Sequence, residues 1–421
     1  MSDPDTTQSA ATYFDEAALL AKIATTLSGL QDEREKRAAV VTELRAVRLS
    51  ALTTIEADLA AAPLAARAAT RAYSQLTDCL VRTAYHLAQD IFHPAPNPTS
   101  AERLAVIAVG GYGRGEMALH SDVDLLFLTP YKMTVWAESV IETMLYILWD
   151  LRLKVGHASR NIRDCIRLGS EDFTIRTAML EQRFLCGDAA LATELEEKLW
   201  QDLFQGTERE FIEAKLEERE ARHEKLGGQR YLVEPNVKEA KGGLRDLQSL
   251  YWIAKYVFRI TSTDDLAGLD VFRPDEFARL EKAENFLWAV RCHLHLTTRR
   301  AMDMLTFDLQ VEIAEKLGYR DKNGRRAVEH FMQSYFLHAT AVGDLTRIFL
   351  TSLEASHAKA APLLQRIFTR KPRPPDGFKV VHNRLAIGDE TLFLTDKLNL
   401  LRLFEEALRT GLLIHPDAMR L

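Results

Sequence analysis

Two aspartates one residue apart follow a glycine-rich turn in the stretch GGYGRGEMALHSDVDLLFL, residues 110–128. The apolar run after them predicts a buried β-strand. Because alternate residues of a strand share a face, Asp122 and Asp124 should project together while Val123 enters the core. Two carboxylates held this close in a low dielectric repel each other unless a cation lies between them. The pattern therefore predicts a metal site where this strand begins.

The glycine turn suits a phosphate group bound beside that cation. Gly110, Gly111 and Gly113 lack side chains, so backbone N–H groups can approach a triphosphate closely. Ser121 can donate to it, and Arg114 is a further candidate ligand. Mg²⁺ prefers carboxylate oxygens together with substrate phosphate oxygens. We therefore expect a metal–nucleotide site. The plain alternative is a tight turn followed by two solvent-exposed acids.

Two common nucleotide-binding motifs do not fit this stretch. The dinucleotide-binding fingerprint needs a third glycine where this chain has Glu116. The Walker A loop needs a Gly-Lys dipeptide, which the sequence lacks.

A third carboxylate would complete a two-metal phosphoryl-transfer site. Asp150 is the first candidate, because DLRLKVGHAS alternates and predicts a strand that Asp150 opens. Arg152 and Lys154 share its face and would suit phosphate charge that develops in the transition state. Asp172 is the fallback. The alternative for Asp150 is an acid in solvent at the C-terminus of a helix.

The hydrophobic pattern of the sequence, which predicts the elements that position these residues, changes along the chain. Residues before Tyr13 lack any period and are expected to be disordered. Helical periodicity predicts helices over 14–92, and a proline-rich linker covers 93–100. Strands are expected near 104–111, 124–130 and 150–159. A helix is expected over 135–149, between the second and the third strand. From about 173 to 357 the pattern is mostly helical. These observations predict a mostly helical α+β protein with a small mixed-sheet core. The expected divisions are an N-terminal helical region (1–100), the core (101–187), a helical domain (188–360) and a C-terminal remnant (361–421).

One segment interrupts the helical half. EPNVKEAKGGLRD places Lys238, Lys241 and Arg245 around the pair Gly242–Gly243. These cations suit a clamp on a nucleotide or on a partner protein. A double glycine before LRDLQ is equally typical of a plain helix start.

Composition excludes several classes. A formal net charge of −6 argues against a general nucleic-acid or membrane-surface binder. The cysteines form no CxxC pair, which favours buried reduced thiols. The N-terminus lacks the features of a signal peptide, and no run of about 18 apolar residues appears. We expect a cytoplasmic protein with neither nucleic-acid nor membrane partners.

The C-terminal part begins after the break KPRPPDG, residues 371–377. FKVVHNRLAI predicts a hairpin around His382 and Asn383. A helix that Gly411 stops should follow, and Pro416 should open another. With so few residues after Pro416, we expect the chain to be cut from a longer protein.

The combined motifs resemble the nucleotidyltransferase superfamily and, within it, the bacterial PII uridylyltransferase family. The signature GGYGRGE…SDVDLLFL carries the superfamily resemblance. Three longer stretches resemble the narrower family: LWDLRLKVGHASRNIRDC (148–165), EPNVKEAKGGLRDLQSLYWIAK (234–255) and FLWAVRCHLHLTTRRAMDMLTFDLQ (286–310). The resemblance covers about residues 68–421. Lys241 departs from it, since the family often has a small residue or proline there.

The resemblance implies transfer of UMP from UTP to a tyrosine of the signal protein PII, with Mg²⁺ or Mn²⁺. Asp122 and Asp124 would then be metal ligands, and Gly110 and Gly111 the phosphate turn. The family also has an HD hydrolase domain and glutamine-sensing ACT domains. This chain has no His-Asp dipeptide, so we expect it to add UMP without removing it and without responding to glutamine. Two alternatives stay open: a protein adenylyltransferase that uses ATP, and a non-catalytic scaffold that binds a nucleotide or PII.

Overall fold

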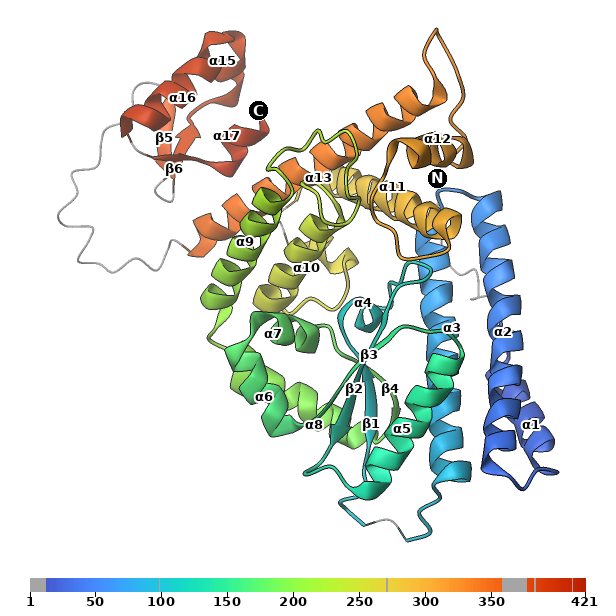
Figure 1. Ribbon diagram of the computed structural model, residues 1–421. Helices are drawn as coiled ribbons and strands as arrows, with labels where there is room; N and C mark the ends of the chain where they lie inside the picture. The colour runs from blue at the N-terminus through green and yellow to red at the C-terminus, as the bar shows by residue number, and fades with distance from the viewer. Residues whose placement is uncertain (1–12, 98, 270–271, 358–376, 382–383, 411) are drawn as a thin grey trace.

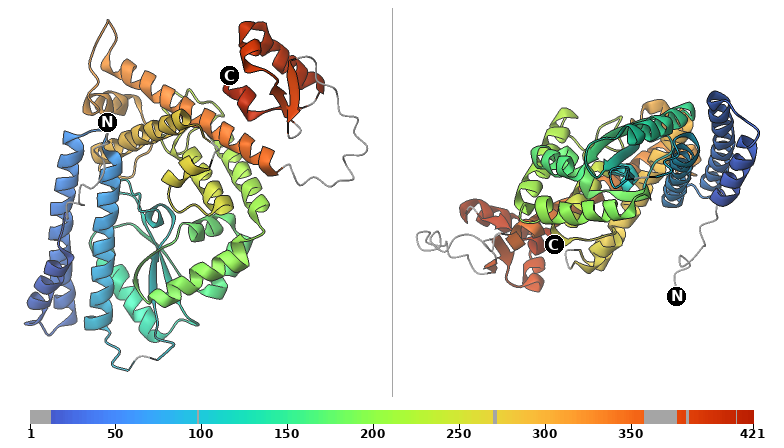
Figure 2. Two further views of the ribbon diagram at one scale, coloured as in Figure 1. Left: turned by 180° about the vertical axis from the view of Figure 1, so that it is seen from behind. Right: turned by 90° about the horizontal axis from the view of Figure 1, so that it is seen from below.

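The computed structural model describes residues 13–97, 99–269, 272–357, 377–381, 384–410 and 412–421. The disorder expected before Tyr13 concerns residues outside this described part. The N-terminal region is helical, as predicted: α1 (Glu16–Leu27), α2 (Glu33–Ala61) and α3 (Ala66–Leu87) are followed by a π-helical turn, η1 (Ala88–Phe92). Figures 1 and 2 show α2 and α3 running side by side along one flank of the molecule.

A four-stranded mixed sheet lies at the centre of the fold (Figure 1). Its strands are β1 (Ala105–Ala108), β2 (Val123–Thr129), β3 (Val155–Asn161) and β4 (Arg183–Gly187), in the spatial order β3-β2-β1-β4. β1 is antiparallel to both β2 and β4, whereas β2 and β3 are parallel. Helix α5 (Val135–Asp150) makes the crossover that a parallel pair requires. The mixed sheet and the mostly helical α+β class are confirmed.

The strand predicted to open at Asp150 begins instead at Val155, so that prediction is wrong. Helix α5 continues through Asp150, and Arg152 takes a left-handed φ of 62° in the turn that follows. Leu151 and Leu153 lie at this turn and are both buried. The alternation of apolar residues therefore reflects burial of these two side chains and not a strand. β4 was not predicted, because five residues beside helical sequence carry too short a pattern.

Helices cover the sheet and build the larger part of the molecule. They are α4 (Gly110–Gly113), α6 (Ile162–Glu171), α7 (Phe173–Leu180), α8 (Ala189–Leu199) with η2 (Trp200–Phe204), α9 (Glu208–Lys225), α10 (Leu244–Phe258), η3 (Asp264–Gly268), α11 (Pro274–Thr298), α12 (Phe307–Lys316) and α13 (Ala327–His357). One apolar core runs from Leu19 on α1 to Leu353 on α13. The four-part division of the chain stays a prediction.

The C-terminal residues form a small unit with an apolar cluster of its own. β5 (Phe378–Val381) and β6 (Arg384–Ile387) make the predicted antiparallel hairpin, and β7 (Leu413–Ile414) pairs parallel to β6. The unit also holds α15 (Glu390–Thr395), α16 (Leu398–Thr410) and α17 (Pro416–Arg420), which Pro416 opens as predicted. The hairpin turn at 382–383 and the expected stop at Gly411 lie outside the described residues. Arg420 joins the unit to α11 through Glu276, at 2.8 Å.

No helix in the described residues has the length and apolar character needed to cross a membrane. The four cysteines are buried and unpaired, as expected.

Candidate active site

A cavity of about 400 Å³ lies where the glycine turn and the start of β2 meet the helices. Several of its lining residues were singled out from the sequence: Gly110, Gly111, Arg114, Ser121, Asp122, Asp124, Lys238 and Arg245. The fold thus brings together two segments, 110–124 and 238–245, that are more than 100 residues apart in the chain. Helices α7, α9, α10 and α11 supply further parts of the wall.

The two aspartates lie together at the edge of this cavity. Asp122 is exposed and Asp124 partly buried, while Val123 between them is fully buried, so the predicted shared face is confirmed. Burial and the negative charge of Asp122 raise the pKa of Asp124 above its usual value, and Lys238 opposes the rise only in part. A carboxylate pair under this repulsion is a favourable place for a cation.

The glycine turn approaches the same pair. Gly110 has a φ of 59°, and a Cβ there would lie 3.5 Å from Asp124 Oδ2. The backbone N–H of Val109 donates to the carbonyl oxygen of Asp124 at 3.0 Å, which ties the turn to β2. Because α4 begins at Gly110, the N–H groups of Gly110 and Gly111 have no intrahelical acceptor. These donors can bind a phosphate beside the carboxylates.

Gly113 has a different reason to be glycine. It does not line the cavity, and a Cβ at this position would lie 1.9 Å from the carbonyl oxygen of Glu181. Gly113 therefore permits close packing of α4 on the end of α7, and the geometry does not support a phosphate contact there. Arg114 lines the cavity, but its guanidinium is buried against Glu181 and lies 3.7 Å from Glu116.

Gly156 is a site residue that sequence reasoning missed. It pairs directly with Asp124 across the parallel strands, and a Cβ there would lie 2.5 Å from Asp124 Oδ1. Any side chain at this position would push on the carboxylate. A glycine within a strand often marks such a close approach, and that signal in VGHAS could have found it.

We expect Gly156→Ala to weaken divalent-cation binding roughly 10–100-fold, as changes to groups that support metal ligands do. The added methyl group must displace the Asp124 carboxylate. Titration with Mn²⁺, followed by electron paramagnetic resonance, measures the affinity. Gly29→Ala is the matched control, because nothing lies within 4 Å of a Cβ there. Unchanged Mn²⁺ affinity in a folded Gly156→Ala variant would contradict this account of the site.

Most of the cations that line the cavity already have partners. Lys215 is 2.6 Å from Glu218, and Arg291 is 2.8 Å from Asp303. Lys238 is less engaged, because its nearest carboxylate, Glu239, is 3.7 Å away. Burial and then the charges of Arg291 and Arg245 lower the pKa of Lys238. A buried ammonium among like charges favours an anionic ligand.

The segment around the double glycine is both a helix start and a part of the site. Gly243 is the N-cap of α10. Gly242 has a φ of 83°, and a Cβ there would meet the carbonyl oxygen of Ala339 at 2.2 Å. Lys238 and Arg245 line the cavity, whereas Lys241 does not. The helix start is therefore confirmed, and the clamp on a nucleotide or a partner protein stays a prediction.

Neither candidate for the third carboxylate reaches the cavity. Asp150 is the exposed last residue of α5, and its carbonyl oxygen accepts from Arg45 at 2.9 Å. Arg152 and Lys154 are exposed and do not line the cavity. Asp172 caps α7 and accepts from the N–H groups of Thr174 and Ile175. Among the described residues no group of three or more His, Cys, Asp or Glu side chains could hold a metal.

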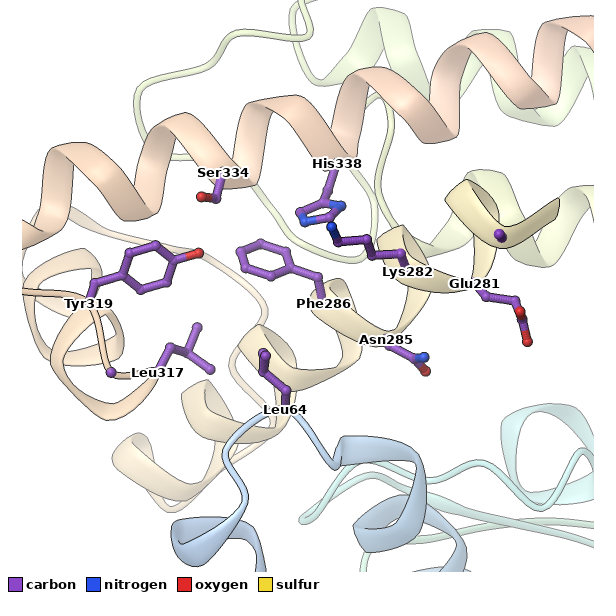
Figure 3. Close-up of a pocket in the computed structure, with 11 residues that line it drawn as sticks. Leu64, Glu281, Lys282, Asn285, Phe286, Leu317, Tyr319, Ser334 and His338 are labelled. Carbon is purple, nitrogen blue, oxygen red and sulfur yellow. The ribbon is translucent and has the colours of Figure 1, made fainter. Parts of the chain in front are cut away.

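A larger cavity, of about 700 Å³, lies between α11, α12 and α13 (Figure 3). The rings of Phe286 and His338 stack there with centroids 4.4 Å apart. Its lining contains a single carboxylate, Glu281, and a single glycine, Gly318, so it offers no carboxylate pair for a cation. The smaller cavity therefore has the chemistry of an active site, although the other is larger.

Two family models match parts of the chain. Residues 210–350 match the model described as GlnD PII-uridylyltransferase, and residues 3–150 match the one described as glutamate-ammonia ligase adenylyltransferase. The first match contains Lys238 and Arg245, and the second contains the glycine turn and both aspartates.

Curated proteins similar to almost the whole chain are named bifunctional uridylyltransferase/uridylyl-removing enzyme. The relative from Ruegeria pomeroyi is 62% identical over 408 residues, which are 97% of this chain and 45% of the relative. That from Cereibacter sphaeroides is 59% identical over 394 residues, 94% of this chain and 42% of the relative. The relative from Rhodopseudomonas palustris is 46% identical over 416 residues, with 97% and 45% covered. The chain therefore spans less than half the length of these relatives.

Proposed function

The chain belongs to the family of bifunctional uridylyltransferase/uridylyl-removing enzymes, and from this membership we propose that it transfers UMP from UTP to a tyrosine of the PII protein. The observation that carries the proposal is the cavity in which Asp122 and Asp124 meet the glycine turn and Lys238. A cytoplasmic location belongs to the same proposal, and the unpaired cysteines fit a reducing compartment.

The similarity to adenylyltransferases does not favour ATP as the substrate. The match to the adenylyltransferase model ends at residue 150, before the segment that holds Lys238 and Arg245. The uridylyltransferase relatives align over 94–97% of the chain, and so across both segments. Their names, together with the match at 210–350, support UTP over ATP.

The residues at the site fit a bound Mg²⁺ or Mn²⁺. Mg²⁺ is typically held by one or two carboxylates together with substrate phosphates and water, and Asp122 and Asp124 supply that number. When bound, the cation would neutralise triphosphate charge and polarise the phosphate that is transferred. The raised pKa of Asp124 reflects burial and repulsion from Asp122, and a bound cation would relieve this repulsion.

The residues of the chain then have separate tasks. Gly110 and Gly111 present N–H groups to the triphosphate, and Lys238 binds one of its oxygens. This holds the α-phosphorus in place for attack by the tyrosine oxygen of PII. A bond forms between that oxygen and the α-phosphorus, and the bond to the β-phosphate oxygen breaks. Diphosphate leaves, and the hydroxyl proton passes to water.

The proposal is tested by incubating the chain with PII, Mg²⁺ and UTP labelled at the α-phosphate. Label on PII is the expected result, with far less from ATP. Preferred labelling from ATP would instead favour the adenylyltransferase alternative. Tight UTP or PII binding without any transfer would favour the non-catalytic scaffold.

We expect Lys238→Met to raise the KM for UTP about 10–100-fold, since a hydrogen bond to a charged group is worth about 1.5–3 kcal/mol. The substitution removes the least engaged cation of the cavity and keeps a side chain of similar length. Initial rates at varied UTP measure the effect. Lys241→Met is the matched control, three residues away and outside the cavity lining. An equal rise in KM in both variants would show that the effect is not a contact with UTP.

A further inference from the structure

Helix α10 forms a wall of the cavity that carries a glutamine without an assigned role. Arg245, Gln248 and Trp252 are spaced three and four residues apart, so they share one helix face, and all three line the cavity. Helix α7 contacts both α4 and α10, and Figure 1 shows α10 beyond α7 and α4 as seen from the sheet. Gln248 keeps only 6% of its surface exposed. Its Nε2 is not among the fully buried atoms that lack a partner, so the remaining exposure of this side chain leaves the amide accessible from the cavity.

Arg245 determines which way the amide of Gln248 faces. Its Nη1 lies 2.9 Å from Gln248 Oε1. A guanidinium can only donate, so the atom facing it must be the amide oxygen. Arg245 is itself held by Glu239 at 3.2 and 3.4 Å, and it lies 5.3 Å above the ring of Trp252. The amide group of Gln248 is therefore left as a donor, and the described residues supply no acceptor for its Nε2.

We propose that Gln248 Nε2 donates a hydrogen bond to O4 of the uracil base and so selects UTP over CTP. This inference rests on the proposed function, in which UTP is the substrate. A nucleotide whose triphosphate lies at Gly110, Asp122 and Asp124 directs its base toward the helical walls of the cavity.

On the α10 wall, Arg245 already donates to Glu239 and Gln248, and the Trp252 indole donates to Glu181. Gln248 Nε2 is the donor of this wall that has no acceptor among the described residues.

The chemistry of pyrimidines explains why O4 is the atom read. C4 lies across the ring from the glycosidic nitrogen, so O4 points away from the ribose and the phosphates, whereas O2 lies beside the ribose. A donor on the wall beyond the base meets the substituent on C4. Cytosine carries an amino group at that position. Two donors would then face each other, and the buried amide would lose its partner.

The test compares kcat/KM for UTP and CTP in the wild-type chain and in Gln248→Glu. Glutamate keeps an acceptor for Arg245 and replaces the Nε2 donor by an oxygen. We expect the preference for UTP over CTP to fall about 10–100-fold. 4-Thio-UTP is a weaker acceptor at this position. Compared with UTP, its kcat/KM should be several-fold lower with the wild type and nearly unchanged with the variant. 2-Thio-UTP should affect the wild type and the variant equally.

A purely structural role for Gln248 predicts a different result. If Gln248 only supports Arg245, its replacement lowers activity with both nucleotides alike, and an unchanged UTP/CTP ratio overturns the inference. Sensitivity to 2-thio-UTP in place of 4-thio-UTP overturns it as well. Gln201→Glu, on an exposed position of η2, is the control and should leave the ratio unchanged.

Equilibrium binding of UTP and CTP without PII separates this inference from the proposed function. In one outcome, the wild type binds UTP more tightly than CTP and Gln248→Glu abolishes this preference, while no UMP is transferred to PII. That result would contradict the proposed function and leave the role of Gln248 intact. Equal binding of the two nucleotides by the wild type would contradict the role of Gln248, even if PII is modified.

Discussion

Asp122→Asn and Asp124→Asn each lower the rate of PII uridylylation on the order of 10³-fold, and both variants remain folded. The substitution is nearly isosteric, so it changes charge and not shape. A neutral amide oxygen holds a divalent cation weakly, and the triphosphate loses its counter-charge. Labelling of PII at saturating UTP and Mg²⁺ measures the rate.

Asp150→Asn is the matched control, because Asp150 ends α5 and does not line the cavity. It should retain nearly full activity. Full activity in the Asp122 or Asp124 variant would place the metal elsewhere, and loss of activity in the Asp150 variant would restore Asp150 as a candidate ligand.

Stability provides a second readout for Asp124. Burial and the charge of Asp122 raise its folded-state pKa, so its ionised form costs stability at neutral pH, and this cost disappears as the pH falls through the folded-state pKa. Without metal, the Tm of Asp124→Asn should therefore equal or slightly exceed that of the wild type at pH 7. A clearly lower Tm would show that the carboxylate has structural partners.

Asp246→Asn lowers the free energy of unfolding by about 3–5 kcal/mol, as expected when one partner of a buried ion cluster is removed. Asp246 is fully buried. It accepts hydrogen bonds from Arg222, from Arg219 at 3.3 Å, from His223 at 2.9 Å and from the N–H of Gly242 at 2.8 Å. An amide at this position leaves Arg219 and Arg222 without the negative charge of Asp246. Urea unfolding at pH 7 measures the change.

The effect of Asp246 depends on pH with a defined sign. Burial opposes its ionisation, but the hydrogen bond from His223 and the charges of Arg219 and Arg222 outweigh burial and lower its pKa. Its contribution is therefore complete above the unfolded-state pKa, about 3.9, and is lost as the pH falls through the folded-state pKa. The stability difference between wild type and variant should narrow below about pH 4.

Asp202→Asn is the control for Asp246. Asp202 is exposed and 3.8 Å from Lys198, and surface pairs contribute about 0–1 kcal/mol. Because Asp246 also holds Gly242, its loss should misplace Lys238 and lower uridylylation. A variant with unchanged stability and activity would contradict the role given to this cluster.

The sequence by itself determined the local chemistry of the site. A glycine turn and two acids at the start of an apolar run sufficed to place Asp122 and Asp124 on one face and Val123 in the core. Helical periodicity likewise predicted α5 and the N-terminal helices. These features depend on neighbours in the chain, whose relative directions the backbone geometry dictates.

The third carboxylate shows where local pattern misleads. Alternating apolar residues after Asp150 are typical of a strand, but Leu151 and Leu153 are buried from a turn in which Arg152 has a positive φ. Helix α5 packs against α2 and α3, and Arg45 of α2 donates to the carbonyl oxygen of Asp150 at the end of this helix. Tertiary contacts of this kind override short patterns.

Only the tertiary structure decided which distant residues complete the site. Gly156 is constrained by its register with Asp124, which requires the crossover through α5. Lys238 and Gln248 reach the cavity because helix α10 packs against α7. They line the cavity together with Gly110 and Gly111 of α4, which are more than 100 residues away in the chain. The periodicity of a segment records which of its faces is buried and not which partner buries it, so the convergence of these segments could not be read from the sequence.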